Sequence, residues 1–84
     1  MKHHVFYFPD ADKAVQLLIS EADDPQAMMR AFETMDRWLS RWPLNIGESR
    51  IENVRVAFEK PIAVQYEVLK DPPTVIVYAA WRTE

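Results

Sequence analysis

The stretch from Gly47 to Trp81, GESRIENVRVAFEKPIAVQYEVLKDPPTVIVYAAW, decides the fold of this chain. Its first residue is the only glycine in the sequence, which indicates a point where the backbone needs a positive φ or approaches another group closely. After the short GESR turn come three β-rich runs, at 53–59, 62–70 and 74–81. Prolines fall in both segments between these runs, as is typical of hairpin turns. This order predicts an antiparallel meander.

The alternation of residues predicts which face of each strand packs. In the first run, Val54, Val56 and Phe58 alternate with polar or small residues, and the run 62–70 repeats the pattern. We therefore expect the valine set to pack and Arg55 to lie on the wetter face of the sheet. In the last run, the residues that point to either face of the sheet are apolar. This predicts a central strand, with another strand paired on each of its edges.

Two helices are expected upstream of the meander. Residues 11–22 carry apolar side chains at helical spacing, and Asp10 is the expected N-cap. Asp24 followed by Pro25 predicts a second helix start, because aspartate caps the helix and proline fits its first position. The second helix is strongly amphipathic and is expected to end at Trp42, which precedes a proline. A link this short predicts an antiparallel helical hairpin.

These elements together predict an α+β fold. The run Val5–Phe8 ends at a proline and is expected to form an edge strand. The predicted order is β-α-α-β-β-β, with the helical hairpin packed on one face of a small antiparallel sheet and the other face partly open. Residues 1–84 are expected to form a single domain.

Composition limits the classes of function. The chain has 49% apolar residues, enough for a core, and no cysteine, so disulfides and thiolate metal sites are excluded and a cytoplasmic protein is expected. No apolar run has the length of a membrane span. The net charge is −3, and no segment has the dense cationic surface of a non-specific phosphate binder. His3 and His4 are adjacent and point to opposite faces of a strand, so neither a metal nor a cofactor is expected.

The second half of the sequence resembles the RelE/ParE superfamily of toxins from type II toxin–antitoxin systems. The resemblance rests on an aromatic-Pro pair at the end of a helix, the GESR turn at 47–50, the run PIAVQYEV at 61–68 and the closing VIVY at 75–78. A Pro-apolar-x-Val-x-Tyr-x-Val pattern after such a turn is typical of plasmid-stabilisation proteins in this group. It covers residues 35–82, and residues 1–34 agree only in the order of elements.

The resemblance implies a toxin that inhibits growth and is neutralised by a cognate antitoxin. The expected antitoxin would contribute an amphipathic helix or an added strand from a disordered tail. Members of this superfamily act either on the ribosome, by cutting mRNA, or on DNA gyrase, without nuclease activity. The alternatives are a degenerate, non-catalytic protein-binding module of the same fold and a ribosome-dependent mRNA endonuclease. A homodimer is also compatible with the resemblance.

The chain departs from the nuclease pattern of the superfamily. Its first meander strand offers one base, Arg55, where the nucleases have two, and Ala63 occupies the position of a phosphate-binding arginine. No tyrosine or histidine follows the last strand in this sequence. Arg55 and Arg82 are the remaining catalytic candidates. The candidate binding residues are Arg50, Lys60, Gln65 and Tyr78.

Each candidate also has a purely structural interpretation. Arg50 could anchor a phosphate, or it could pair with Glu48 or with helix-terminal carbonyls. Tyr66 is in phase with buried valines and is expected in the core with its hydroxyl hydrogen-bonded, whereas Tyr78 could face either side. For the large side chains of the second helix we expect burial. The core set is Met28, Met35, Trp38 and Trp42, while Met29 and Trp81 could stay exposed as part of a groove for a partner helix.

Overall fold

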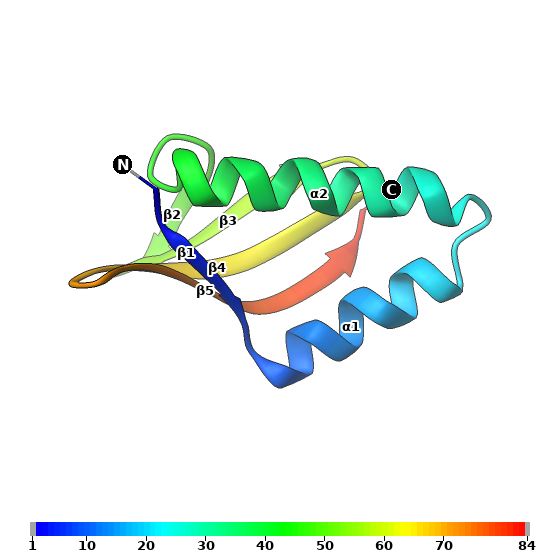
Figure 1. The fold of residues 1–84 in the computed structure, drawn as a ribbon, viewed down its shortest axis with the longest axis horizontal. Coiled ribbons are helices and arrows are strands. Elements are labelled where there is room, and N and C mark those ends of the chain that lie inside the picture. The colour runs from blue at the N-terminus through cyan, green and yellow to red at the C-terminus, as the bar shows by residue number, and fades with distance from the viewer. Residues whose placement is uncertain (1, 84) are drawn as a thin grey trace.

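The computed structural model describes residues 2–83 and places two helices on one face of a five-stranded sheet (Figure 1). In chain order the elements are β1 (His4–Tyr7), α1 (Pro9–Ser20), α2 (Pro25–Arg41), β2 (Glu48–Ile51), β3 (Val54–Glu59), β4 (Ile62–Lys70) and β5 (Pro73–Arg82). The predicted α+β class and the helical layer on one face are confirmed. Within the described part of the chain, no helix has the length and hydrophobicity of a membrane span.

The sheet differs from the prediction in two details. Its strand order is β1-β5-β4-β3-β2, and β1 runs parallel to β5, so the sheet is mixed rather than purely antiparallel. Residues 48–51, which were expected to form a turn, are the edge strand β2, paired with β3. All four side chains of β2 are exposed, and for this reason the strand has no alternating apolar signature in the sequence. The predicted edge position of β1 and interior position of β5 are confirmed.

Helix α1 begins earlier than the sequence suggested. Pro9 occupies the first helical position and Phe8 is the N-cap, without a side-chain hydrogen bond. The prediction of Asp10 as N-cap was wrong, because the fixed φ of proline already suits the first turn of a helix. Asp10 and Asp12 lie in that first turn instead, where negative charge is favourable next to the helix dipole.

Helix α2 follows its predicted signals closely. The Asp24 carboxylate accepts a hydrogen bond from the backbone N–H of Ala27 at 3.1 Å, and Pro25 stands at the first helical position. The helix ends at its C-cap, Trp42. The side chain of Trp42 is 48% exposed, so its predicted place in the core was wrong. It lies beyond the last turn that packs on the sheet, whereas Met28 and Met35 are buried as expected.

The core lies between the helices and the helix-facing side of β4 and β5. Five strand residues and five residues of α2 form most of it, all almost completely buried: Ile62, Val64, Tyr66, Val75 and Val77 from the sheet and Met28, Ala31, Phe32, Met35 and Leu39 from the helix. At about 1.5–3 kcal/mol for each large apolar side chain taken out of water, this layer is the main source of stability. The expected burial of Tyr66 is confirmed.

The register of β3 against β4 reverses the predicted faces of β3. Ala57 pairs with Val64 and Arg55 pairs with Tyr66, so both β3 residues share the helix-covered side with the core. Phe58, on the opposite side, is 49% exposed. The expected wet-face position of Arg55 was therefore wrong. Val54, Val56 and Phe58 are the larger apolar set of β3, but the register with β4 places the other set, which contains Arg55 and Ala57, under the helices.

Gly47 is required for close packing rather than for an unusual backbone angle. The structure gives it no positive φ. A Cβ atom at this position would lie 3.1 Å from the carbonyl oxygen of Val56 and closer still to the hydroxyl of Tyr66. Of the two expectations for the only glycine, the close approach is confirmed and the positive φ is wrong.

We predict that Gly47→Ala lowers the free energy of unfolding by about 1–3 kcal/mol, because the added methyl overlaps the Tyr66 hydroxyl in a packed site. Urea denaturation measures the loss. Tyr66→Phe removes the atom that the methyl meets, so the double variant should lose at least about 0.5 kcal/mol less than the sum of the single losses. Full additivity of the two losses would contradict this explanation.

We also predict that Asp24→Ala costs about 1 kcal/mol of folding free energy, because the N–H of Ala27 loses its only side-chain acceptor at the start of α2. The matched control is Asp23→Ala, which removes the same charge from the neighbouring exposed position and should change stability by no more than about 0.5 kcal/mol. Equal losses in the two variants would attribute the effect to charge and not to capping.

Candidate functional site

The face of the sheet opposite the helices carries a cluster of exposed aromatic side chains. We define the open face by the strand residues whose side chains alternate with those of the core: Phe6, Val54, Val56, Phe58, Ala63, Gln65, Glu67, Ile76, Tyr78 and Trp81. Phe6 and Phe58 are both 49% exposed, and Trp81 is 38% exposed. Both helices pack on the other face in Figure 1. The open face is thus an apolar surface without a covering layer among residues 2–83.

Phe58, Ala63 and Trp81 form a row across three strands of the open face. Phe58 is the partner of Ala63 in β4, and Ala63 is the partner of Trp81 in β5. Ala63 is completely buried even though both helices are on the other side, so its two large neighbours shield it. The position that the resemblance associates with an arginine therefore holds a small side chain between two aromatic ones. The expected exposure of Trp81 is confirmed.

Tyr78 lies on the open face at a β-bulge. Gln65 pairs with Ala79 but Tyr66 pairs with Val77, which leaves Tyr78 as the extra residue of β5. Its hydroxyl donates a hydrogen bond to Oε1 of Glu67 at 2.7 Å, and this bond is the main cause that raises the pKa of Tyr78. The ring of Tyr78 also packs on Phe8, with centroids 5.6 Å apart. The alternation of residues in the sequence predicted neither the face on which Tyr78 lies nor its hydrogen bond to a carboxylate.

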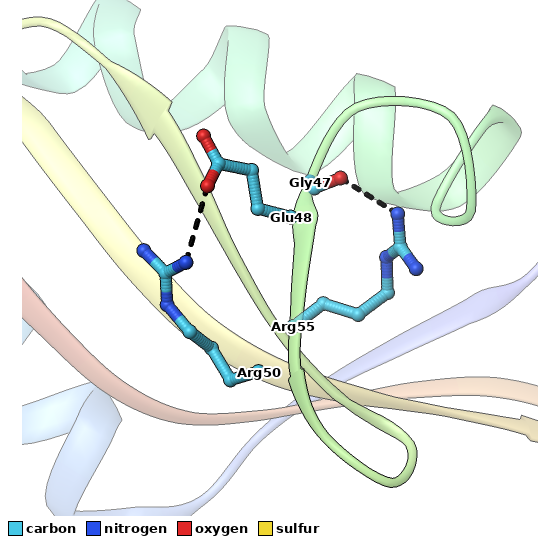
Figure 2. Close-up of polar contacts among 4 residues, drawn as sticks. All are labelled: Gly47, Glu48, Arg50 and Arg55. Carbon is cyan, nitrogen blue, oxygen red and sulfur yellow. Dashed lines mark hydrogen bonds and ion pairs between the residues drawn. The ribbon is translucent and has the colours of Figure 1, made fainter.

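Cationic groups are scarce on the open face. Glu48 is the partner of Val56, which places it on this side, and Glu67 is already bonded to Tyr78. Arg50 donates to Oε1 of Glu48 at 3.1 Å, as Figure 2 shows, which confirms the structural interpretation of this arginine. An exposed pair of this kind contributes no more than about 1 kcal/mol. Gln65 contributes an uncharged side chain.

Arg55 holds the loop between α2 and β2. Its Nη2 donates to the carbonyl oxygens of Leu44 at 3.1 Å and Gly47 at 2.6 Å, and Figure 2 shows the second of these bonds. The hydroxyl of Tyr66 donates to the carbonyl of Pro43 at 2.6 Å in the same loop. Burial raises the pKa of Tyr66, and the neighbouring Arg55 cation partly opposes this shift. We call this set of contacts the loop clamp.

The two catalytic candidates are far apart. Arg55 pairs with Tyr66, whereas Arg82 pairs with Ile62, four residues away along β4. At about 3.3 Å per residue, the two positions are separated by roughly 13 Å along the sheet. Lys60 lies in the turn between β3 and β4, at the same end as Arg82. The candidates therefore do not converge on one scissile phosphate.

The aromatic residues Phe6, Phe8 and Phe58 are the part of the site that sequence reasoning missed. Phe58 was assigned to the packed side, and the other two were interpreted only as strand formers. A signal was available for Phe6, because β1 has large apolar residues pointing to both faces while the helices can cover only one. Phe58 gave no such signal, because the large apolar residues of β3 all share one face.

Comparisons with known proteins identify the fold. No protein-family model and no curated protein sequence matches the chain. Among solved structures, a chain of the toxin–antitoxin complex RelBE2 from Mycobacterium tuberculosis matches 98% of this chain and 99% of its own length, with a TM-score of 0.82 and 18% identity. A chain of the chromosomal ParDE toxin–antitoxin system from P. aeruginosa covers 99% and 98%, with a TM-score of 0.73 and 13% identity.

A third solved structure has a more distant likeness. The conserved hypothetical protein HP0892 from Helicobacter pylori matches 95% of this chain and 93% of its own length, with a TM-score of 0.60 and 11% identity. At identities this low the likeness concerns the fold, and it extends over the helices and the sheet alike. The chain therefore shares the fold of the RelBE2 and ParDE chains, in agreement with the fold that the resemblance of its second half implied.

Proposed function

We propose that this protein is the toxin of a type II toxin–antitoxin module and that a cognate antitoxin neutralises it by covering the open face. The observation that carries the proposal is the uncovered aromatic surface on this particular fold. The structures that share the fold over nearly their whole length include chains of a toxin–antitoxin complex and of a toxin–antitoxin system. A toxin role with a protein partner follows by analogy with those proteins.

The chemistry of the open face favours a protein partner over RNA. Large exposed apolar patches are typical of protein interfaces, where aromatic side chains are enriched and charges are few. A groove for single-stranded RNA would combine aromatic rings with cations along the backbone path. Here the face itself carries Glu48, Glu67 and the ion-paired Arg50. The cations Lys60 and Arg82 lie only at one end of it, close to Phe58 and Trp81 in the chain. An amphipathic helix or an added strand of an antitoxin fits this surface.

The action on the target is proposed to occur by binding. Translation and DNA gyrase are the two targets that the superfamily suggests, and RNA cleavage needs a cation at the scissile phosphate and a group for proton transfer close together. Arg55 is engaged by two loop carbonyls and lies roughly 13 Å from Arg82 along the sheet. This arrangement favours a protein that inhibits growth without cutting mRNA.

A non-catalytic binding module of the same fold is the second candidate. The buried Ala63 between Phe58 and Trp81 favours it, because that row is suited to contact and not to chemistry. The two candidates share the partner-binding surface and differ in whether the free protein is toxic.

We predict that inducing the chain alone in bacteria arrests growth, and that co-expression of a small, partly disordered protein encoded by the neighbouring gene restores it. Colony counts after induction measure both effects. Normal growth on induction of soluble, folded protein would favour the binding module and contradict the toxin proposal.

We predict that Phe58→Glu combined with Trp81→Glu weakens binding of that neighbouring protein at least a hundredfold, because two aromatic contacts near the centre of an interface typically contribute more than 2 kcal/mol each. Calorimetric titration measures the affinity and circular dichroism confirms folding. The control is Leu17→Glu, at an exposed apolar site on α1, which should leave the affinity unchanged. If Leu17→Glu had the greater effect, the helical layer would be the binding surface instead.

We predict that Arg82→Ala retains toxicity and that mapping of mRNA ends after induction gives no new ends dependent on the protein. The reason is the distance between Arg82 and Arg55, which prevents the two from acting on one phosphate. New 5′ ends that appear with the wild type and vanish with Arg82→Ala would revive the endonuclease alternative.

A further inference from the structure

A small hollow lies beside the loop clamp, on the helix-covered side of the sheet and at its β2–β3 turn end. Its volume is about 140 Å³, and it is lined by residues from five parts of the chain: His3, Leu44, Glu52, Asn53, Arg55, Val68 and Lys70. The position of His3 is fixed through its backbone, because its N–H donates to the carbonyl of Ser40 at 2.7 Å and its carbonyl accepts from the Ser40 hydroxyl. The hollow is therefore built from fixed segments.

Two of the residues that line the hollow have unused hydrogen-bonding capacity. Nδ1 of His3 and Nε of Arg55 are buried and have no hydrogen-bond partner, whereas Nη2 of Arg55 is bonded to the loop. A buried polar group left without a partner costs about 1–3 kcal/mol, and such groups commonly mark the place of a bound ion, ligand or water. Both residues line the same small space.

The charge of the hollow is opposite to that of the protein. Arg55 and Lys70 contribute two cations and Glu52 one carboxylate, a net of +1 with His3 neutral, whereas the whole chain has a net charge of −3. Within residues 2–83, Lys70 has no ion-pair partner. The loop carbonyls hold the Arg55 guanidinium in place, so an anion would not have to order it on binding.

We propose that this hollow binds a phosphate group. Arg55 of β3, Lys70 of β4 and His3 of the N-terminal segment line the hollow from different elements, and their side chains carry donors suited to a tetrahedral oxyanion. The hollow of about 140 Å³ is small, and one phosphate group is the occupant that we propose for it. The site is separate from the open face and does not depend on the toxin proposal.

The test is a titration of the folded chain with inorganic phosphate. Amide chemical shifts and the melting temperature are measured at each phosphate concentration. Sodium chloride at matched ionic strength is the reference. We expect saturable shifts confined to the residues lining the hollow, together with a rise in melting temperature, because the ligand binds the folded state. Shifts of equal size with chloride, or shifts centred elsewhere, would overturn the proposal.

Two variants and one matched control make the test specific. Lys70→Gln should weaken phosphate binding about tenfold, since it removes a charged donor, and His3→Phe should weaken it while leaving the backbone bonds to Ser40 intact. Lys13→Gln removes the same charge from exposed α1 and should bind as the wild type does. If Lys70→Gln and Lys13→Gln weakened binding equally, only the general charge of the protein would be involved.

Two further probes show which kind of phosphate compound the hollow binds. Adenosine 5′-monophosphate carries a terminal phosphate, and a dinucleoside monophosphate carries only a phosphodiester. Binding of inorganic phosphate alone identifies the free ion as the ligand, and binding of the 5′-monophosphate as well identifies a terminal phosphate. Binding of the phosphodiester alone would overturn the proposal, because the hollow would then be part of a nucleic-acid track.

Discussion

The loop clamp is the interaction on which the rest of the structure depends. Arg55 and Tyr66 are neighbours across β3 and β4, and together they bind three carbonyl oxygens of the loop that joins α2 to the sheet. Gly47 lets this loop approach the Tyr66 hydroxyl without a steric clash. The clamp thereby fixes where the chain leaves the helical layer and where the edge strand β2 begins.

The helical layer and the open face have opposite roles. The helices bury one side of β4 and β5 almost completely, which stabilises the fold, and the apolar side chains of the other side have no helical layer over them. A chain of this size has only two helices available, and both are used on one face. The aromatic row and Tyr78 therefore remain available to a partner. The hollow that we propose to bind phosphate lies on the helix-covered side of the sheet, away from the open face.

Prediction from sequence succeeded where the signal was local. The cap Asp24, the proline at the start of α2 and the amphipathic period of that helix act within a few residues, and the structure agrees with them. The pairing of Arg50 with Glu48 is local too. The faces of β3 were assigned wrongly, because alternation favoured the face with the larger apolar residues, whereas the register with Tyr66 places Arg55 under the helices. The edge strand β2 was missed because every side chain in it is exposed.

The sequence by itself determined the two helices, four of the five strands, the order of these elements and the close approach at Gly47, since propensity, capping and hydrophobic period are properties of neighbouring residues. Only the tertiary structure decided the parallel pairing of β1 with β5, the roughly 13 Å between Arg55 and Arg82 and the convergence of His3, Arg55 and Lys70 on one hollow. Each of these depends on strand direction and register between distant segments. Packing of the whole sheet selects them, and no short stretch of sequence encodes them.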